Sequence, residues 1–169
     1  MDDVLDERVR GDVERQGFHL GLVPPEAGTP GWAFTIGLVE RFDHPEILAF
    51  APDPDFLRGL VGGLAERVRG GRRFEAEERY PDVLGDHDVA LREVDRKWYT
   101  TFLGNVAWHY GGESFRALQC FWPDRAGRFP WEDDFDPDWR DDQPLLHLHE
   151  THRALSESLL AVLRKEGAL

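Results

Sequence analysis

The chain has 169 residues, the length of one domain, and 41% of them are hydrophobic, so it can bury a core without covalent cross-links. Its formal net charge of −13 disfavours binding to the phosphate backbone of nucleic acids. A single cysteine, Cys120, excludes an internal disulfide framework, and no segment has the roughly 20 apolar residues of a membrane span. We therefore expect a cytoplasmic protein that forms a single domain over residues 1–169, with neither nucleic-acid nor membrane partners.

The first half of the sequence predicts three strands and two helices. Apolar residues that alternate, or that run on without a break, predict strands at residues 18–22, 32–39 and 47–51. The first two of these strands are expected to pair as a hairpin, and the third is expected to be buried on both faces. Apolar residues at helical spacing predict helices over residues 4–16 and 54–70, each followed by glycine.

The second half predicts two more strands and two more helices. The strands are expected over residues 89–94 and 115–122, and the helices over residues 96–110 and 151–166. The order of these elements lacks a regular strand–helix–strand alternation. It therefore favours an α+β fold with a largely antiparallel mixed sheet and about four helices. A partly closed barrel is the alternative form of the sheet.

Three short motifs together resemble a known family. They are the strand Phe34–Leu38, the turn His44-Pro45-Glu46, and the Gln119–Trp131 run with its Trp-Pro-Asp and Gly-Arg-Phe-Pro-Trp segments. This combination is similar to the uncharacterised bacterial family DUF4262. The resemblance covers about residues 17–146 and leaves residues 147–169 as a C-terminal helical extension. It implies a small stand-alone bacterial protein, and it supplies no catalytic residues, since the family has no assigned activity.

The turn after the second predicted strand holds the candidate catalytic residues Asp43, His44 and Glu46. A histidine beside carboxylates suits a general base, because its pKa lies near neutrality and a carboxylate can orient the ring. The same residues also fit an ordinary turn before a buried strand. Both interpretations stay open at this point.

A second cluster, His147, His149 and His152, contains candidate ligands for a divalent metal ion. The match to the histidine motif of metallo-hydrolases is incomplete, because Thr151 stands where that motif needs an acid. The alternative is a loop of solvent-facing histidines that leads into the last helix. No other cofactor is predicted.

Five further residues are candidates for contacts with a ligand or a partner: Trp32, Thr35, Asp124, Arg128 and Trp131. The first two lie in the segment that leads to Glu46, and the other three lie in the Asp124–Trp131 hairpin, which we expect to be the partner of that segment in any site. The leading hypothesis is a binding or accessory module for a small ligand or a protein partner. The competing hypothesis is a small enzyme that uses His44 with Asp43 or Glu46, or a metal held by the histidine cluster. A flavin-binding or pyridoxal-phosphate-oxidase-type barrel ranks last, since the sequence lacks a basic phosphate cradle.

Overall fold

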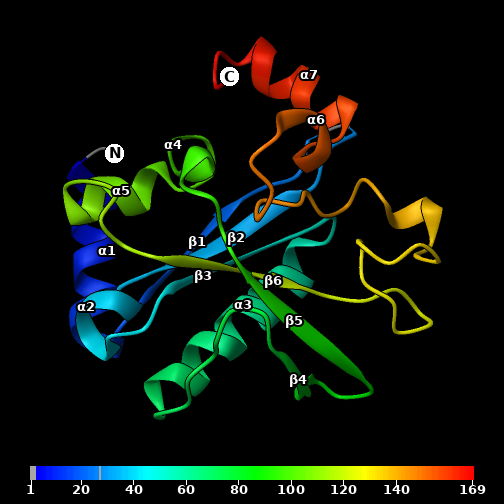
Figure 1. The fold of residues 1–169 in the computed structure, drawn as a ribbon. Helices are drawn as coiled ribbons and strands as arrows, with labels where there is room; N and C mark the ends of the chain where they lie inside the picture. The colour runs from blue at the N-terminus through cyan, green and yellow to red at the C-terminus, as the bar shows by residue number, and fades with distance from the viewer. Residues whose placement is uncertain (1–2, 27) are drawn as a thin grey trace.

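A six-stranded mixed sheet forms the centre of the computed structural model, which describes residues 3–26 and 28–169 (Figure 1). The strands are β1 (His19–Val23), β2 (Gly31–Ile36), β3 (Glu46–Ala51), β4 (Arg79–Leu84), β5 (His87–Glu93) and β6 (Ala117–Phe121). They are ordered β1-β2-β3-β6-β5-β4. β3 and β6 are parallel, and every other neighbouring pair is antiparallel. The predicted α+β class and the largely antiparallel mixed sheet are confirmed. The sheet is open between β1 and β4, so the alternative of a partly closed barrel is wrong.

Within the described residues the chain forms seven α-helices and two short 3₁₀ helices, where about four helices were predicted. The α-helices are α1 (Asp3–Gln16), α2 (Leu38–Phe42), α3 (Pro54–Arg69), α4 (Tyr99–Phe102), α5 (Gly104–Tyr110), α6 (Thr151–Ala154) and α7 (Glu157–Lys165). The 3₁₀ helices are η1 (Arg96–Trp98) and η2 (Pro137–Trp139). The predicted number was wrong because α2 was not foreseen and two predicted helices are each divided.

Both divisions occur where the backbone leaves the helical region. The predicted helix over residues 96–110 breaks at Leu103, which has φ −126° and ψ 31°. The predicted helix over residues 151–166 breaks at Leu155 and Ser156, which are both extended. The hydroxyl of Ser156 then caps α7 by accepting a hydrogen bond from the backbone N–H of Leu159.

The second strand is shorter than predicted because of Gly37. This residue has φ 118°, a left-handed conformation that glycine adopts without strain, and it turns the chain from β2 into α2. A Cβ at this position would lie 2.8 Å from the carbonyl oxygen of Gly17. The sequence did not predict β4, because that edge strand is mostly exposed and contains Pro81, which weakens a strand signal.

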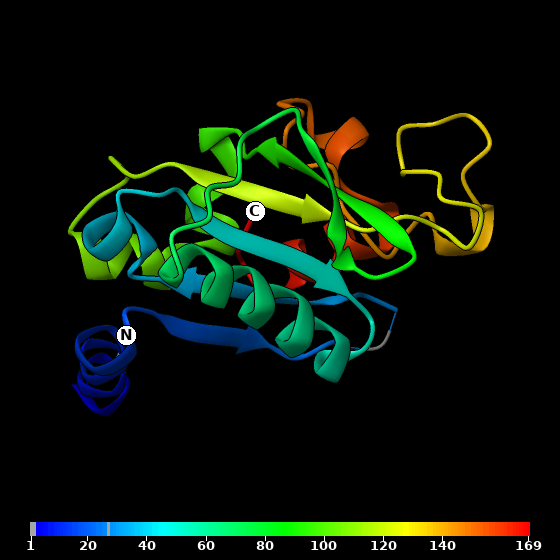
Figure 2. The same cartoon turned by 90° about the horizontal axis from the view of Figure 1, so that it is seen from below.

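Helices cover both faces of the sheet (Figures 1 and 2). α3 packs along one face, mainly against β2 and β3, and its buried apolar side chains share one core with those of β5 and β6. α1, α4, α5, α6 and α7 contribute to the core on the opposite face. Among the described helices, none is both long enough and apolar enough to cross a membrane.

Candidate functional site

The carboxylate of Glu46 is completely buried at the start of β3 and is surrounded by hydrogen-bond donors. The Thr35 hydroxyl donates to it at 2.7 Å, and the Tyr110 hydroxyl also donates to it. Three backbone N–H groups at the start of α2 donate at 3.1–3.2 Å, from Gly37, Leu38 and Val39. Burial raises the pKa of Glu46, although these donors act in the opposite direction. Glu46 therefore caps the N-terminus of α2, although it lies eight residues after Leu38, the first residue of that helix.

His44 is also buried, and both of its ring nitrogens have partners. The backbone N–H of Phe74 donates to Nε2 at 2.9 Å, so the proton lies on Nδ1 and is donated to the carbonyl of Pro45 at 2.7 Å. Burial lowers the pKa of His44 and keeps the ring neutral. Asp43 ends α2 with φ 51°, and its carbonyl accepts a hydrogen bond from Arg73 at 2.7 Å. His44 thus links the segment after α3 to the start of β3.

The two predicted binding residues on β2, Trp32 and Thr35, both make contacts inside the protein. The Trp32 indole N–H donates to the Phe102 carbonyl at 3.1 Å, and its ring packs against Phe50 and Phe102. Thr35 is fully buried and connects Glu46 to the backbone N–H of Ile47.

Asp124 organises the loop that follows β6. Its carboxylate accepts hydrogen bonds at 2.9 Å from the backbone N–H groups of Ala126, Arg128 and Asp136. Burial alone would raise the pKa of Asp124, but the backbone donors outweigh it and lower the pKa below its usual range. The guanidinium of Arg128 donates to the carbonyl of Asp134 at 2.6 Å.

Asp124 follows the carboxyl end of β6, whereas His44 precedes the amino end of the parallel strand β3. The His44 turn and the Asp124 loop therefore lie at opposite ends of these strands, whereas Trp32, which pairs with Phe50 of β3, lies at the same end as Asp124.

Trp131 forms a cluster with Arg92 and His147. The Trp131 ring stacks on Phe129 with centroids 5.2 Å apart, and the Arg92 guanidinium lies 3.7 Å from the centroid of the Trp131 ring. Arg92 also donates to Nε2 of His147 at 2.9 Å. Burial, reinforced by the positive charge of Arg92, lowers the pKa of His147 to about 4.

The three histidines predicted as metal ligands have different partners. His147 faces Arg92, His149 lies 3.3 Å from Asp95, and His152 lies 3.6 Å from Glu150. The side chains of His149 and His152 are 73% and 78% exposed. Within residues 3–26 and 28–169 no group of three or more His, Cys, Asp or Glu side chains is arranged to hold a metal ion.

Two glutamines attach the segment 143–146 to β6. The side-chain amide of Gln119 bonds to the backbone of Pro144 and Leu146, at 2.8 and 3.1 Å. The amide of Gln143 bonds to both the N–H and the carbonyl of Trp122, at 3.1 and 2.9 Å. The C-terminal segment is thus held beside the end of β6.

An apolar cavity of about 380 Å³ opens at the carboxyl ends of β3 and β6, and we call it the aromatic cleft. It is lined by Ala51, Pro52, Asp53, Phe56, Leu84, His87, Trp122, Pro123 and Trp139. The Trp122 ring contacts Phe56 at a centroid distance of 5.6 Å and Trp139 at 5.7 Å. The Trp122 indole N–H donates to the Phe50 carbonyl at 2.7 Å, which fixes the orientation of this ring in the lining of the cleft.

Two polar side chains contribute to the aromatic cleft. Asp53 is exposed at the start of α3, where its Oδ1 atom accepts a hydrogen bond from the backbone N–H of Asp55 at 3.0 Å. His87 is half-buried and begins β5. The sequence alone did not group Trp122 and Trp139 with these residues. The signal available was Pro52 and Pro123, which follow the two strands that the fold places side by side.

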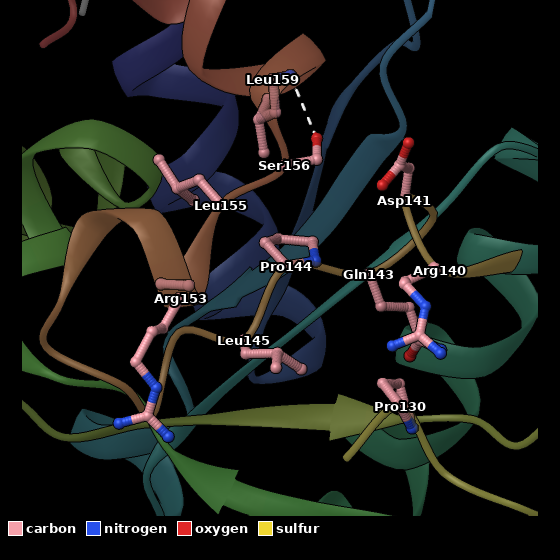
Figure 3. A pocket seen from close by; sticks show the side chains of 11 residues that line it. Pro130, Arg140, Asp141, Gln143, Pro144, Leu145, Arg153, Leu155, Ser156 and Leu159 are labelled. Carbon is pink, nitrogen blue, oxygen red and sulfur yellow. Dashed lines mark hydrogen bonds between the residues drawn. The ribbon is translucent and has the colours of Figure 1, made fainter. Parts of the chain in front are cut away.

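A second cavity, of about 230 Å³, lies between the segment 140–145 and the helices α6 and α7 (Figure 3). We call it the C-terminal cavity. Its lining residues are Pro130, Arg140, Asp141, Gln143, Pro144, Leu145, Arg153, Ala154, Leu155, Ser156 and Leu159.

These features define an α+β fold with an open mixed sheet. The model of the family described as "Domain of unknown function (DUF4262)" matches residues 12–136, and the chain belongs to this family. No curated protein and no solved structure gives a significant match. All lining residues of the aromatic cleft except Trp139 fall within the residues that the family model matches. Of the residues that line the C-terminal cavity, Pro130 alone falls within that match.

Proposed function

We propose that this protein is a binding module for a small ring-bearing molecule, which it holds in the aromatic cleft. The observation that carries the proposal is a cavity walled by three aromatic side chains, Phe56, Trp122 and Trp139. Its volume of about 380 Å³ falls within the roughly 300–1,000 Å³ of small-molecule sites. A concave cavity of this size suits a small ligand better than the surface of a protein partner.

The position of the cleft supports the same proposal. In open sheets, ligands bind outside the carboxyl ends of parallel strands, where the chain leaves neighbouring strands in different directions. β3 leads into α3 on one face of the sheet, whereas the chain after β6 enters the loop that carries η2. The cleft lies between the point where the chain leaves β3 and the point where it leaves β6.

The polar groups of the cleft limit the chemistry of the ligand. One carboxylate oxygen of Asp53 already accepts a hydrogen bond from Asp55, while the side chain as a whole is exposed. Asp53 can therefore accept a further hydrogen bond from the ligand. The ligand that fits these groups has one or two flat rings, which stack on the tryptophans, and an amino or hydroxyl group that donates to Asp53.

The contacts of His44 and Glu46 favour binding over the enzymatic alternative. Both ring nitrogens of His44 are engaged, and the Glu46 carboxylate is enclosed by five donors. A general base needs a free position toward its substrate, and His44 gains one only by breaking a buried hydrogen bond.

The test is a binding screen with a panel of one-ring and two-ring amines and phenols, followed by thermal shift and tryptophan fluorescence. Compounds that bind should raise the melting temperature of the wild type. Trp139→Ala should weaken their binding about fivefold or more, since an aromatic contact contributes on the order of 1 kcal/mol. Trp108→Ala is the matched control, because that side chain is 60% exposed on α5. Unchanged affinity in Trp139→Ala, or no binding by any compound, would contradict the proposal.

A further inference from the structure

Two arginine side chains line the C-terminal cavity together with an apolar floor. Arg140 and Arg153 lie on opposite sides of Leu145, and both contribute to the lining (Figure 3). Pro130, Pro144 and Leu155 supply further apolar surface around Leu145. A molecule that lies across this floor can present one end to each arginine.

The charges of these arginines are only weakly matched within the protein. In the part of the chain that the structure describes, the Arg140 guanidinium has neither a hydrogen bond nor an ion pair. Arg153 has one ion pair, with Glu150, at the long distance of 3.4 Å and between half-exposed side chains. Arg72 differs from both, because it makes two hydrogen bonds to the carboxylate of Asp82. Although the chain has a net charge of −13, two weakly paired guanidinium groups at one cavity are available to pair with an anionic ligand.

The acidic side chain of this cavity lies apart from the arginines. Asp141 directs its carboxylate toward the Ser156 side, whereas Arg140 directs its guanidinium toward Pro130 (Figure 3). The Ser156 hydroxyl is already the cap of α7, since it accepts a hydrogen bond from Leu159. The end of the cavity that carries the arginines is therefore the end suited to negative charge.

From this arrangement we infer that the C-terminal cavity binds a short aliphatic dicarboxylate, with one carboxylate at Arg140 and the other at Arg153. The guanidinium fork matches a carboxylate in geometry as well as in charge. The cavity of about 230 Å³ lies below the usual range for drug-sized ligands, which suits a short chain over Leu145. This site is separate from the aromatic cleft and does not depend on the proposed function.

The test compares adipate, which has two carboxylates, with hexanoate, which has one, by calorimetry on the full chain. We expect adipate to bind about fivefold more tightly than hexanoate or better, and its affinity to fall with added salt. Arg140→Gln and Arg153→Gln should each reduce adipate binding to the level of hexanoate. Glu150→Gln should strengthen adipate binding, because Glu150 competes for Arg153.

The control is Arg69→Gln, which removes a similarly exposed arginine that pairs with Glu66 at the end of α3. It should leave adipate binding unchanged, and melting temperatures should show that all variants are folded. Trp139→Ala should also bind adipate normally, which distinguishes this site from the aromatic cleft. Absent adipate binding, equal binding of adipate and hexanoate, or an equal loss in Arg69→Gln would overturn the inference.

Discussion

The two ends of the parallel pair β3–β6 differ in how their functional groups are engaged. At the amino end of β3, Glu46 and His44 are buried, and their hydrogen-bonding atoms have partners inside the protein. At the carboxyl end, Trp139 and Phe56 are only half-buried and border an open cavity. A cavity of about 350 Å³ also lies beside His44, so the two ends differ in how fully their side chains are engaged and not in the presence of a cavity.

The largest effect is expected for Glu46→Ala. The variant leaves the Thr35 hydroxyl and the backbone N–H groups of Leu38 and Val39 without their buried acceptor, at about 1–3 kcal/mol for each unsatisfied group. We expect a loss of at least about 3 kcal/mol in the free energy of unfolding, measured in urea. Glu93→Ala, which removes an exposed ion pair with Arg116, should cost less than about 1 kcal/mol. Equal effects of the two variants would show that Glu46 does not hold this end of the sheet.

Gly37→Ala tests the same end through the backbone. Alanine is strained at φ 118°, and its Cβ would meet the Gly17 carbonyl oxygen at 2.8 Å, so we expect a loss of about 2–3 kcal/mol. Gly59→Ala is a control that should instead raise stability, since Gly59 lies inside α3 with no neighbour near its Cβ position. That control should gain about 0.5–1 kcal/mol. The account of α2 fails if both substitutions change stability in the same direction.

The neutral state of His44 predicts a pH dependence of stability. Burial lowers the pKa of His44 in the folded protein, so the unfolded chain binds the proton more readily. The contribution of neutral His44 to the free energy of unfolding is complete above the pKa of the unfolded state, about 6.5. It is lost as the pH falls through the pKa of the folded state. His44→Gln keeps an acceptor for the Phe74 N–H but does not titrate. Its free energy of unfolding should fall less between pH 7 and pH 5 than that of the wild type.

The smallest effect is expected for Phe56→Leu in the aromatic cleft. Leucine preserves apolar volume, so stability should change by less than about 1.5 kcal/mol. The loss of one aromatic wall should nevertheless weaken binding of a ring-bearing ligand by about 0.5–1.5 kcal/mol, measured by fluorescence titration. If affinity is unchanged, the cleft binds by apolar contact alone or the ligand lies elsewhere.

Local sequence patterns predicted much of the fold but little of the cleft. The buried strand β3 and the amphipathic helix α3 have strong local signals, and the structure confirms both. α2 was missed because its cap is Glu46, a contact that no local pattern encodes. The cleft was missed because Trp122 joins Phe56 only after β3 and β6, which are distant in the sequence, become neighbours. The apolar spacing of Phe56 is also what any buried helix face requires.

The most direct test of the account follows the indole N–H signals of the six tryptophans by two-dimensional NMR during titration with a ring-bearing amine found in the screen. Trp122 and Trp139 line the aromatic cleft, so their signals should shift, and backbone signals of residues 44–46 should not. The indoles of Trp32 and Trp98, bonded to the carbonyls of Phe102 and Leu148, should also stay in place. Shifts confined to residues 44–46, with Trp122 and Trp139 unmoved, would contradict the assignment of binding to the carboxyl end of the sheet.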